Sequence, residues 1–314
     1  MPPLDERLRL AELTMTALAT PGAAQLPSKI AIHPRPDGSF VHAMPAHLRG
    51  ALPGDDLVGM KWVAGFSTNA PAGLPAISAL VVVNDPATGI PTAVLDGGPI
   101  TAARTAAVSG VAIRRLGPRP AGPSEAAVIG AGVQGRAHLP VLAHVLPGLA
   151  LRIHDRDADR AAALADAARA IPGIGEAVVA GSARDAVAGA DLVVTAASFT
   201  TPDRRGAMTN DWLKMSATVV AVDYATYAAP EVAWAAALFV VDEREQFLAN
   251  REEGNFDGYP DPSATLGEVI LGGMERPAGR VLVTHLGVGL ADVVFGDAIV
   301  RRAAELGLGT TLSR

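Results

Sequence analysis

The chain has 314 residues, of which 49% are hydrophobic and 18% charged. This length allows about two domains, and the composition excludes a disordered or low-complexity protein. The formal net charge of −6 comes without any Lys- or Arg-rich stretch, so we expect no nucleic-acid partner. The absence of cysteine excludes disulfide scaffolds and thiolate nucleophiles. We expect a cytoplasmic protein without a secretory signal or a membrane span.

Short apolar runs separated by turn residues occupy the first third of the chain. Three of these runs are predicted strands: 61–66, 80–84 and 90–95. The last two are joined by a turn that contains Pro and Gly, which is typical of a hairpin in an antiparallel sheet. Thr101 is predicted to cap a helix over 102–116. The Gly- and Pro-rich segment 117–123 ends that helix and marks a domain boundary.

Beyond this boundary the pattern changes to alternating strands and helices. The predicted strands are 125–129, 151–155, 176–180, 191–197, 218–222 and 237–241, and the predicted helices are 133–146, 158–170, 184–189 and 292–306. A βαβαβ order predicts a Rossmann-type, doubly wound parallel sheet with helices on both faces. We therefore expect an α/β protein. Residues 1–120, completed by 285–314, would form an antiparallel-sheet domain for substrate binding and dimerisation, and 121–284 a Rossmann domain.

A G-x-G-x-x-G motif lies directly between the first strand and the first helix of this second domain. Gly130 permits the tight turn, Gly132 lets the backbone approach a pyrophosphate, and Gly135 allows close packing of the helix on the strand. Val133 and Gln134 begin the helix, whose N-terminal amides favour phosphate. The motif therefore predicts a dinucleotide cofactor.

The residues at the ends of two later strands indicate which dinucleotide binds. Asp155 ends the second strand, where its carboxylate can accept both ribose hydroxyls of NAD and would repel a 2′-phosphate. Arg156 could instead attract that phosphate, so NADP stays open. Thr195, near the end of strand 191–197, is a further expected cofactor contact.

Three other charged residues are candidates for chemistry. Lys61 lies within an apolar strand, where a cation is costly unless it meets an anion, although a lysine on a solvated strand face fits equally. Arg104 is expected in the first turn of its helix, where a cation is disfavoured unless an anionic ligand compensates. Asp223 follows a strand at the carboxyl edge of the sheet and can exchange a proton there, although a solvated loop residue or helix cap is the alternative. The seven histidines show no metal-ligand spacing.

A series of short motifs runs through the whole chain: MPA at 44–46, GMKWV at 59–63, GLP at 73–75, DPATG at 85–89, DG at 96–97, ITAARTAA at 100–107, the glycine motif, Asp223 and LGEV at 266–269. These segments resemble the ornithine cyclodeaminase/mu-crystallin family over nearly the whole chain. The resemblance implies a homodimer that binds NAD(P) in the Rossmann domain and a small amino or imino acid between the domains. It also implies that Lys61 and Arg104 anchor an α-carboxylate, that Arg104 and Thr105 contact the cofactor, and that Lys61 and Asp223 handle protons.

The chemistry implied by the resemblance is hydride transfer between a nicotinamide and the α-carbon of an α-amino or α-imino acid. A cyclodeaminase returns the hydride after the second amine of ornithine has closed the ring, and so makes proline and ammonia. A ketimine reductase or amino-acid dehydrogenase performs one half of that cycle. A crystallin-like dimer that binds without turnover and an opine-type dehydrogenase are further alternatives.

Three positions depart from the family pattern. Lys29 replaces an arginine that clamps the carboxylate, which keeps the charge but loses the bidentate fork. Ala76 replaces a threonine, and 284–287 replaces a Ser-containing turn near the ligand. These departures weaken the case for ornithine itself but leave an α-amino or α-imino carboxylate in place.

Overall fold

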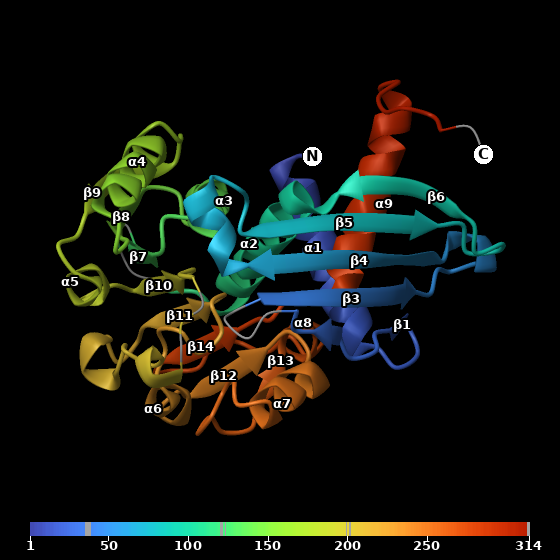
Figure 1. Cartoon of the computed structure of the whole chain (residues 1–314). Helices are drawn as coiled ribbons and strands as arrows, with labels where there is room; N and C mark the ends of the chain where they lie inside the picture. Colours follow the sequence, from blue (N-terminus) through green and yellow to red (C-terminus); the bar gives the residue numbers. More distant parts are fainter. Residues whose placement is uncertain (35–38, 120–121, 123, 199, 201, 313–314) are drawn as a thin grey trace. The chain divides into compact units, whose positions relative to one another are not determined.

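Figure 1 shows the computed structural model of the chain, which describes residues 1–34, 39–119, 122, 124–198, 200 and 202–312. Two compact units make up the chain: Met1–Arg104 with Gly287–Arg314, and Thr105–Leu286. The division falls inside helix α2 (Gly97–Leu116), earlier than the Gly- and Pro-rich segment at which the sequence marks a boundary. Pro120, Ala121 and Pro123 of that segment lie outside the described residues.

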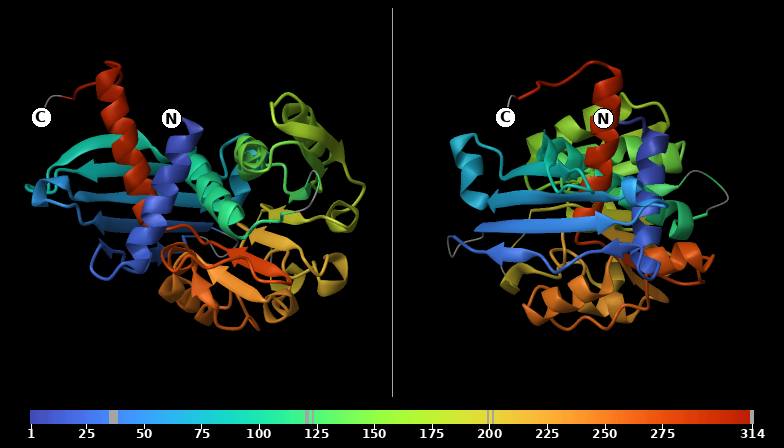
Figure 2. Two further views of the ribbon diagram at one scale, coloured as in Figure 1. Left: turned by 180° about the vertical axis from the view of Figure 1, so that it is seen from behind. Right: turned by 90° about the vertical axis from the view of Figure 1, so that its right-hand side faces the viewer.

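The first unit is built on an antiparallel sheet of order β1-β3-β4-β5-β6, in which β2 also pairs with β3. Its strands are β1 (Ala24–Gln25), β2 (Ile30–Ile32), β3 (Ser39–Leu48), β4 (Leu57–Phe66), β5 (Ile77–Asn84) and β6 (Pro91–Asp96). The predicted antiparallel sheet and the β5–β6 hairpin are confirmed. Helices α1 (Leu4–Ala19) and α9 (Gly289–Glu305) lie side by side against this sheet (Figure 2).

Alternation along β4 decides which side chains of the first unit are buried. Gly59, Lys61 and Val63 point to the face that α9 covers, and a Cβ on Gly59 would touch Val293 of that helix. Trp62 points to the opposite face and is 45% exposed. One face of the sheet therefore forms a core with α9, while the other presents side chains outward.

The second unit contains an all-parallel sheet of order β13-β12-β14-β11-β10-β7-β8-β9 (Figure 1). Its strands are β7 (Glu125–Ile129), β8 (Leu149–His154), β9 (Ile174–Val179), β10 (Leu192–Thr195), β11 (Thr218–Ala221), β12 (Leu238–Val241), β13 (Ala264–Thr265) and β14 (Val281–Thr284). The order reverses between β7 and β10, which confirms the predicted Rossmann-type topology. Ligands bind such sheets at the carboxyl ends of the strands beside this reversal.

The helices of the second unit follow its strands in the predicted alternation. They are α3 (Val133–Val145), α4 (Ala158–Arg169), α5 (Ala183–Val187), α6 (Pro230–Trp234), α7 (Arg244–Glu252) and α8 (Leu266–Leu271). The first three and α9 lie close to their predicted limits, whereas helices α1, α6, α7 and α8 and strand β3 were not predicted. Among the described residues, no helix combines the length and apolar character that a membrane crossing needs.

The predicted start of helix α2 is wrong. The helix begins at Gly97, and Asp96 Oδ1 accepts a hydrogen bond of 2.9 Å from the Gly98 N–H, so Asp96 rather than Thr101 caps it. Pro99 fits in the first turn because its missing N–H has no helical partner there. Arg104 consequently lies about two turns into the helix, and the expected conflict between this cation and the helix N-terminus does not arise.

Candidate active site

One buried carboxylate bridges two buried cations in the first unit. Lys61 Nζ lies 2.6 Å from Asp292 Oδ2, and Arg104 Nε donates to Asp292 Oδ1 at 3.1 Å. The side chains of Lys61, Arg104 and Asp292 are 2%, 6% and 0% exposed. The alternative of Lys61 on a solvated strand face is therefore wrong. Two cations and one anion leave this cluster with one net positive charge.

Lys29 contributes to the same positive region. Burial lowers the pKa of Lys61 to about 7, Asp292 acts against this, and Arg104 and Lys29 lower the pKa further. Lys29 is half-buried immediately before β2. The structure thus brings together the three residues that the sequence assigns to a substrate carboxylate, and together they favour an anion.

Arg104 retains donors for such an anion. Its Nη1 and Nη2 atoms have no hydrogen-bond partner within the described part of the chain, since Asp292 uses only Nε. The guanidinium lies against Gly287, where a Cβ would overlap it and where φ is +80°. A side chain at position 287 would be strained and would displace Arg104, so this glycine leaves room for the fork.

Asp223 is buried at the carboxyl edge of the parallel sheet, 1% exposed, directly beyond β11. Thr195 at the end of β10 donates its hydroxyl to Asp223 Oδ1 at 2.6 Å, and the Ala197 N–H donates to Oδ2 at 3.2 Å. Burial raises the pKa of Asp223 to about 7, although both hydrogen bonds act in the opposite direction. This carboxyl group can therefore exchange a proton near neutral pH, and the alternative of a solvated loop residue is wrong.

The turn after Asp223 has an unusual backbone. Tyr224 has a φ of +58°, which no other non-glycine residue in the described ranges shares, and its ring stacks on Phe256 with centroids 5.5 Å apart. Such a conformation costs free energy in a non-glycine residue, so the surrounding contacts must hold it. The turn is therefore a fixed support for Asp223.

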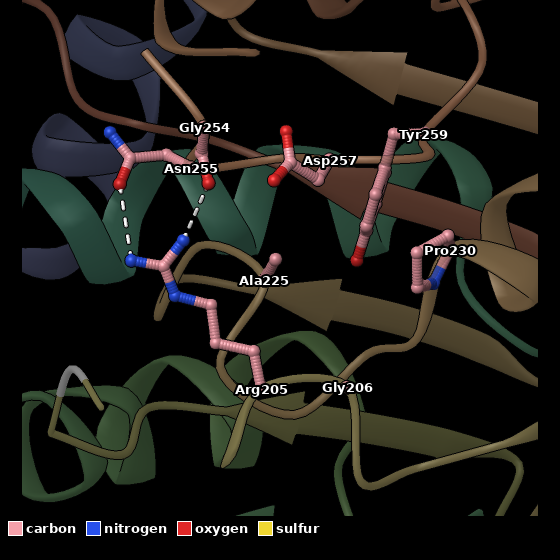
Figure 3. Close-up of a pocket in the computed structure, with 8 residues that line it drawn as sticks. All are labelled: Arg205, Gly206, Ala225, Pro230, Gly254, Asn255, Asp257 and Tyr259. Carbon is pink, nitrogen blue, oxygen red and sulfur yellow. Dashed lines mark hydrogen bonds between the residues drawn. The ribbon is translucent and has the colours of Figure 1, made fainter. Parts of the chain in front are cut away.

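A cavity of about 150 Å³ lies behind the same turn (Figure 3). Arg205 Nη1 donates to Gly254 O at 2.8 Å, and the Tyr259 hydroxyl donates to Ala228 O at 2.6 Å. Figure 3 shows Arg205 directed at the Gly254 carbonyl oxygen and the Asn255 side chain rather than into open space. None of the predicted site residues lines this cavity. The hydrogen bonds of Arg205 and Tyr259 thus join the loop that follows Asp223 to the loops around residues 205 and 254–259.

The glycine motif has the shape that a dinucleotide needs. Gly130 has a φ of +105°, and a Cβ there would overlap the Ala196 carbonyl oxygen. A Cβ on Gly135 would overlap the Gly130 carbonyl oxygen, whereas one on Gly132 would meet nothing within 4 Å. The turn is therefore tightly packed on the sheet side and open over Gly132, where a pyrophosphate would approach.

The start of α3 adds donors and an unpaired acceptor to this turn. The Arg136 N–H bonds to Gly132 O, which leaves the amides of Val133 and Gln134 without helical partners. Gln134 Oε1 is buried and has no hydrogen-bond partner in the described structure. The two free amide donors fit a bound dinucleotide phosphate, whereas Gln134 Oε1 could only accept from a donor group of a ligand.

The remaining predicted cofactor residues lie at or near this turn or in α2. Asp155 Oδ2 accepts from the Ala131 N–H at 2.6 Å, so the carboxylate is fixed beside the glycine turn, and Arg156 next to it is exposed. Thr195 bonds to Asp223, as described above. Thr105 is buried in α2.

Two buried groups were not predicted from the sequence. Asp292 has no local signal beyond being an acid within the apolar run 288–295. The second group joins three elements: Ser109 Oγ on α2 lies 2.8 Å from Nε2 of His138 on α3 and 2.8 Å from Nε2 of His285 after β14. Both pairs are distant in sequence, and no spacing could have revealed either.

The protonation of this second group follows from its geometry. His138 Nδ1 lies 2.7 Å from the Gln134 carbonyl oxygen, so Nδ1 must carry a proton. Burial lowers the pKa of His138 to about 4, which keeps the ring neutral and its Nε2 an acceptor. Ser109 therefore donates to His138 and accepts from the Nε2–H of His285.

A Rossmann-type unit with a glycine turn, joined in one chain to an antiparallel sheet with a buried cationic cluster, defines a class of nicotinamide-dependent enzyme folds. The chain belongs to the Ornithine cyclodeaminase/mu-crystallin family, whose model matches residues 6–305. The family resemblance of the sequence motifs is thereby confirmed.

Known relatives span nearly the whole chain. It is 37% identical over 317 residues to the nodulation efficiency protein NfeD of Rhizobium meliloti, which covers 99% of this chain and 94% of that protein. It is 28% identical over 303 residues to the ketimine reductase mu-crystallin of Mus musculus, with 95% and 90% covered. The solved structure of Thermococcus litoralis Δ1-pyrroline-2-carboxylate reductase with NADH and L-proline matches with a TM-score of 0.86 at 26% identity, over 99% of this chain and 96% of that one.

Proposed function

We propose that this protein is an NAD-dependent enzyme that transfers a hydride at the α-carbon of an α-amino or α-imino acid. The observation that carries the proposal is the buried Lys61–Asp292–Arg104 cluster with its net positive charge, which suits a carboxylate. Relatives named for ketimine and pyrroline-carboxylate reduction support the same chemistry. The nicotinamide of the bound cofactor supplies the hydride donor or acceptor.

The first unit would bind the substrate through its carboxylate. The free Nη1 and Nη2 atoms of Arg104 suit a bidentate pair with the two carboxylate oxygens, and Lys61 and Lys29 add positive charge. Because this region of the unit is buried, water competes weakly for the anion. Loss of the arginine fork should therefore raise KM.

The second unit would hold the cofactor and exchange the proton. The open face over Gly132 and the amides of Val133 and Gln134 fit the pyrophosphate, and Asp155 fits a ribose. We propose NAD as the cofactor, with NADP open because Arg156 is exposed beside Asp155. Arg104 and Thr105 stay predicted cofactor contacts.

Asp223 would carry the proton of the substrate nitrogen. Oxidation of an amine to an imine removes one hydride from the α-carbon and one proton from nitrogen, and the ionised carboxylate can accept that proton. Reduction reverses both transfers, and the protonated carboxyl group then donates. A pKa of about 7 allows Asp223 to serve in both directions.

Two reactions use this arrangement. The cyclodeaminase reaction, ornithine to proline and ammonia, is the reading that the family motifs favour. Ketimine reduction is the second candidate, and Lys29 and Ala76 favour it because they depart from the family pattern for ornithine. The named reductases among the relatives favour it as well.

The test is to incubate the purified protein with NAD⁺ and L-ornithine and to measure proline, ammonium and NADH together. Proline and ammonium without NADH accumulation would establish a cyclodeaminase. If no proline forms, Δ1-pyrroline-2-carboxylate with NADH is assayed next, and NADH oxidation would establish a reductase. Cofactor binding without hydride exchange on any amino or imino acid tried would contradict the enzyme proposal.

A cytoplasmic location stays a prediction of the sequence.

We also propose a homodimer formed by the antiparallel sheets. On the face opposite α9, Trp62, Leu80 and Val94 are 45%, 49% and 61% exposed, and Trp62 pairs directly with Leu80. A contiguous apolar face of this kind is typical of an interface. We expect Trp62→Glu to convert the dimer to a monomer in analytical ultracentrifugation. Met215→Glu, at an exposed apolar residue of the other unit, is the control.

A further inference from the structure

We propose that Asp292 is the positioning residue of the carboxylate site: it orients Lys61 and Arg104 toward the substrate anion and keeps Lys61 a cation. The inference rests on the proposed function, because it concerns the same site. It assigns a role to a residue that lies far from every motif in the sequence.

The geometry of Asp292 supports this role. Its two oxygens are divided between the two cations, with Lys61 on Oδ2 and Arg104 on Oδ1. The three side chains come from three elements, β4, α2 and α9, so the carboxylate joins parts of the unit that are not neighbours in sequence. Asp292 lies in the first turn of α9, where the helix N-terminus stabilises an ionised carboxylate.

The hydrogen bond from Arg104 to Asp292 decides which N–H groups of the guanidinium are available to an anion. Asp292 occupies Nε, and Gly287 leaves space beside the group. The N–H groups of Nη1 and Nη2 that do not face Gly287 are the donors left for an anion. Without Asp292, the Arg104 guanidinium would lose the hydrogen bond that holds it in this orientation.

The charge of Asp292 also decides whether Lys61 is a cation. Burial and the positive charges of Arg104 and Lys29 lower the pKa of Lys61, and Asp292 alone raises it, with its Oδ2 at 2.6 Å from Nζ. Removal of that carboxylate would favour the neutral amine, which cannot attract a carboxylate. The pH range in which the site binds an anion therefore depends on Asp292.

The experiment measures binding of pyrrole-2-carboxylate, a planar carboxylate without a reducible C=N bond, by isothermal titration calorimetry from about pH 6 to about pH 9. The full chain is compared with Asp292→Asn. We expect at least about tenfold weaker binding at pH 8 and a pH dependence displaced to lower pH. A merely structural ion pair would lower stability without moving the pH dependence.

Asp297→Asn is the matched control. Asp297 lies on the same helix, is partly buried, and pairs with Arg301 at 2.8 Å, away from the cationic cluster. Its change to Asn should leave affinity within about twofold of the unmodified chain. Equal affinity and equal pH dependence in the two variants would overturn the proposal.

Two further measurements cover the case in which Asp292→Asn does not fold. Asp292→Glu keeps the charge and should retain the pH dependence of binding even if its longer side chain weakens affinity. In the unmodified chain, titrations at pH 8 in two buffers of different ionisation enthalpy should show proton uptake with the ligand, because the bound anion favours protonated Lys61. A pH dependence of binding by Asp292→Glu that is displaced to lower pH would overturn the proposal.

The binding readout separates this inference from the proposed function. Binding that depends on Asp292, with no turnover of any amino or imino acid, would contradict the enzyme and leave the role of Asp292 intact. Turnover of an amino or imino acid, with the same affinity and pH dependence in Asp292→Asn and Asp297→Asn, would support the enzyme and overturn the role of Asp292. Absence of pyrrole-2-carboxylate binding to the unmodified chain would overturn the inference.

Discussion

Asp223 keeps its carboxyl group in a nearly dry environment, between Thr195 and the Ala197 amide. Asp223→Asn preserves the shape but removes proton exchange, so turnover should fall by about 100-fold or more while cofactor affinity is retained. Steady-state kinetics and a fluorescence titration with NADH measure the two effects. Asp257→Asn, at an exposed residue of the same unit, is the control. Unchanged turnover would remove Asp223 from the reaction.

Asp155 should determine the choice between the two nicotinamide cofactors. Its carboxylate is fixed by the Ala131 amide beside the glycine turn, where it would repel a 2′-phosphate. Asp155→Ala should therefore lower the preference for NAD over NADP, measured as the ratio of the two kcat/KM values. An unchanged ratio would transfer the choice of cofactor to Arg156.

Some of the charged residues of the candidate site could be predicted from the sequence and others could not. Lys61 could be singled out as a cation within an apolar strand and Asp223 as an acid at the carboxyl edge of the sheet, whereas Arg104 was singled out for a place in the first helical turn that it does not have. Asp292 could not be singled out, since 188 positions separate it from Arg104 and only the folded chain brings them together. A charge whose partner is distant in sequence can be recognised as costly, but its partner cannot be identified.

At the scale of elements, the Ser109 hydroxyl connects α2, α3 and the end of β14. Ser109→Ala would leave the buried Nε2 atom of His138 without its hydroxyl donor and remove the same hydroxyl from His285, so we expect a loss of about 1–3 kcal/mol in the free energy of unfolding. Urea denaturation measures it. Ser216→Ala, at an exposed serine of the same unit, should leave the free energy within about 0.5 kcal/mol. A loss as small for Ser109 would show that water or a shifted side chain satisfies both rings.

The strands of the second unit could be predicted because buried parallel strands are short, continuous apolar runs between turn residues. Helix α2 was predicted too short, since Thr101 is a good capping residue and Gly97 and Gly98 are poor helix formers. Asp96, which precedes those glycines, caps helix α2 and so decides where it begins. Helix α1 was missed because its buried positions, such as Leu8, Ala11 and Met15, are interspersed with charged residues.

At the scale of the whole molecule, the pH dependence should reveal the direction of the reaction. In the proposed mechanism Lys61 must be protonated to bind the carboxylate, so we expect activity in both directions to fall as pH rises through about 7. Asp223 must be ionised for oxidation and protonated for reduction, with a pKa also about 7. Oxidation should therefore show a narrow maximum near pH 7, whereas reduction should rise toward lower pH. Profiles of kcat/KM in both directions test this, and a plateau for both across neutral pH would contradict it.

The first unit is made from two segments of chain that the entire second unit separates. A ribosome delivers a chain from its N-terminus, and domains generally fold as they emerge. The second unit is continuous and can fold as soon as its last strand, β14, is complete. The antiparallel sheet must wait for α9, with Lys61 on its uncovered face and no counter-ion. The proposed carboxylate site is therefore completed only when α9 arrives.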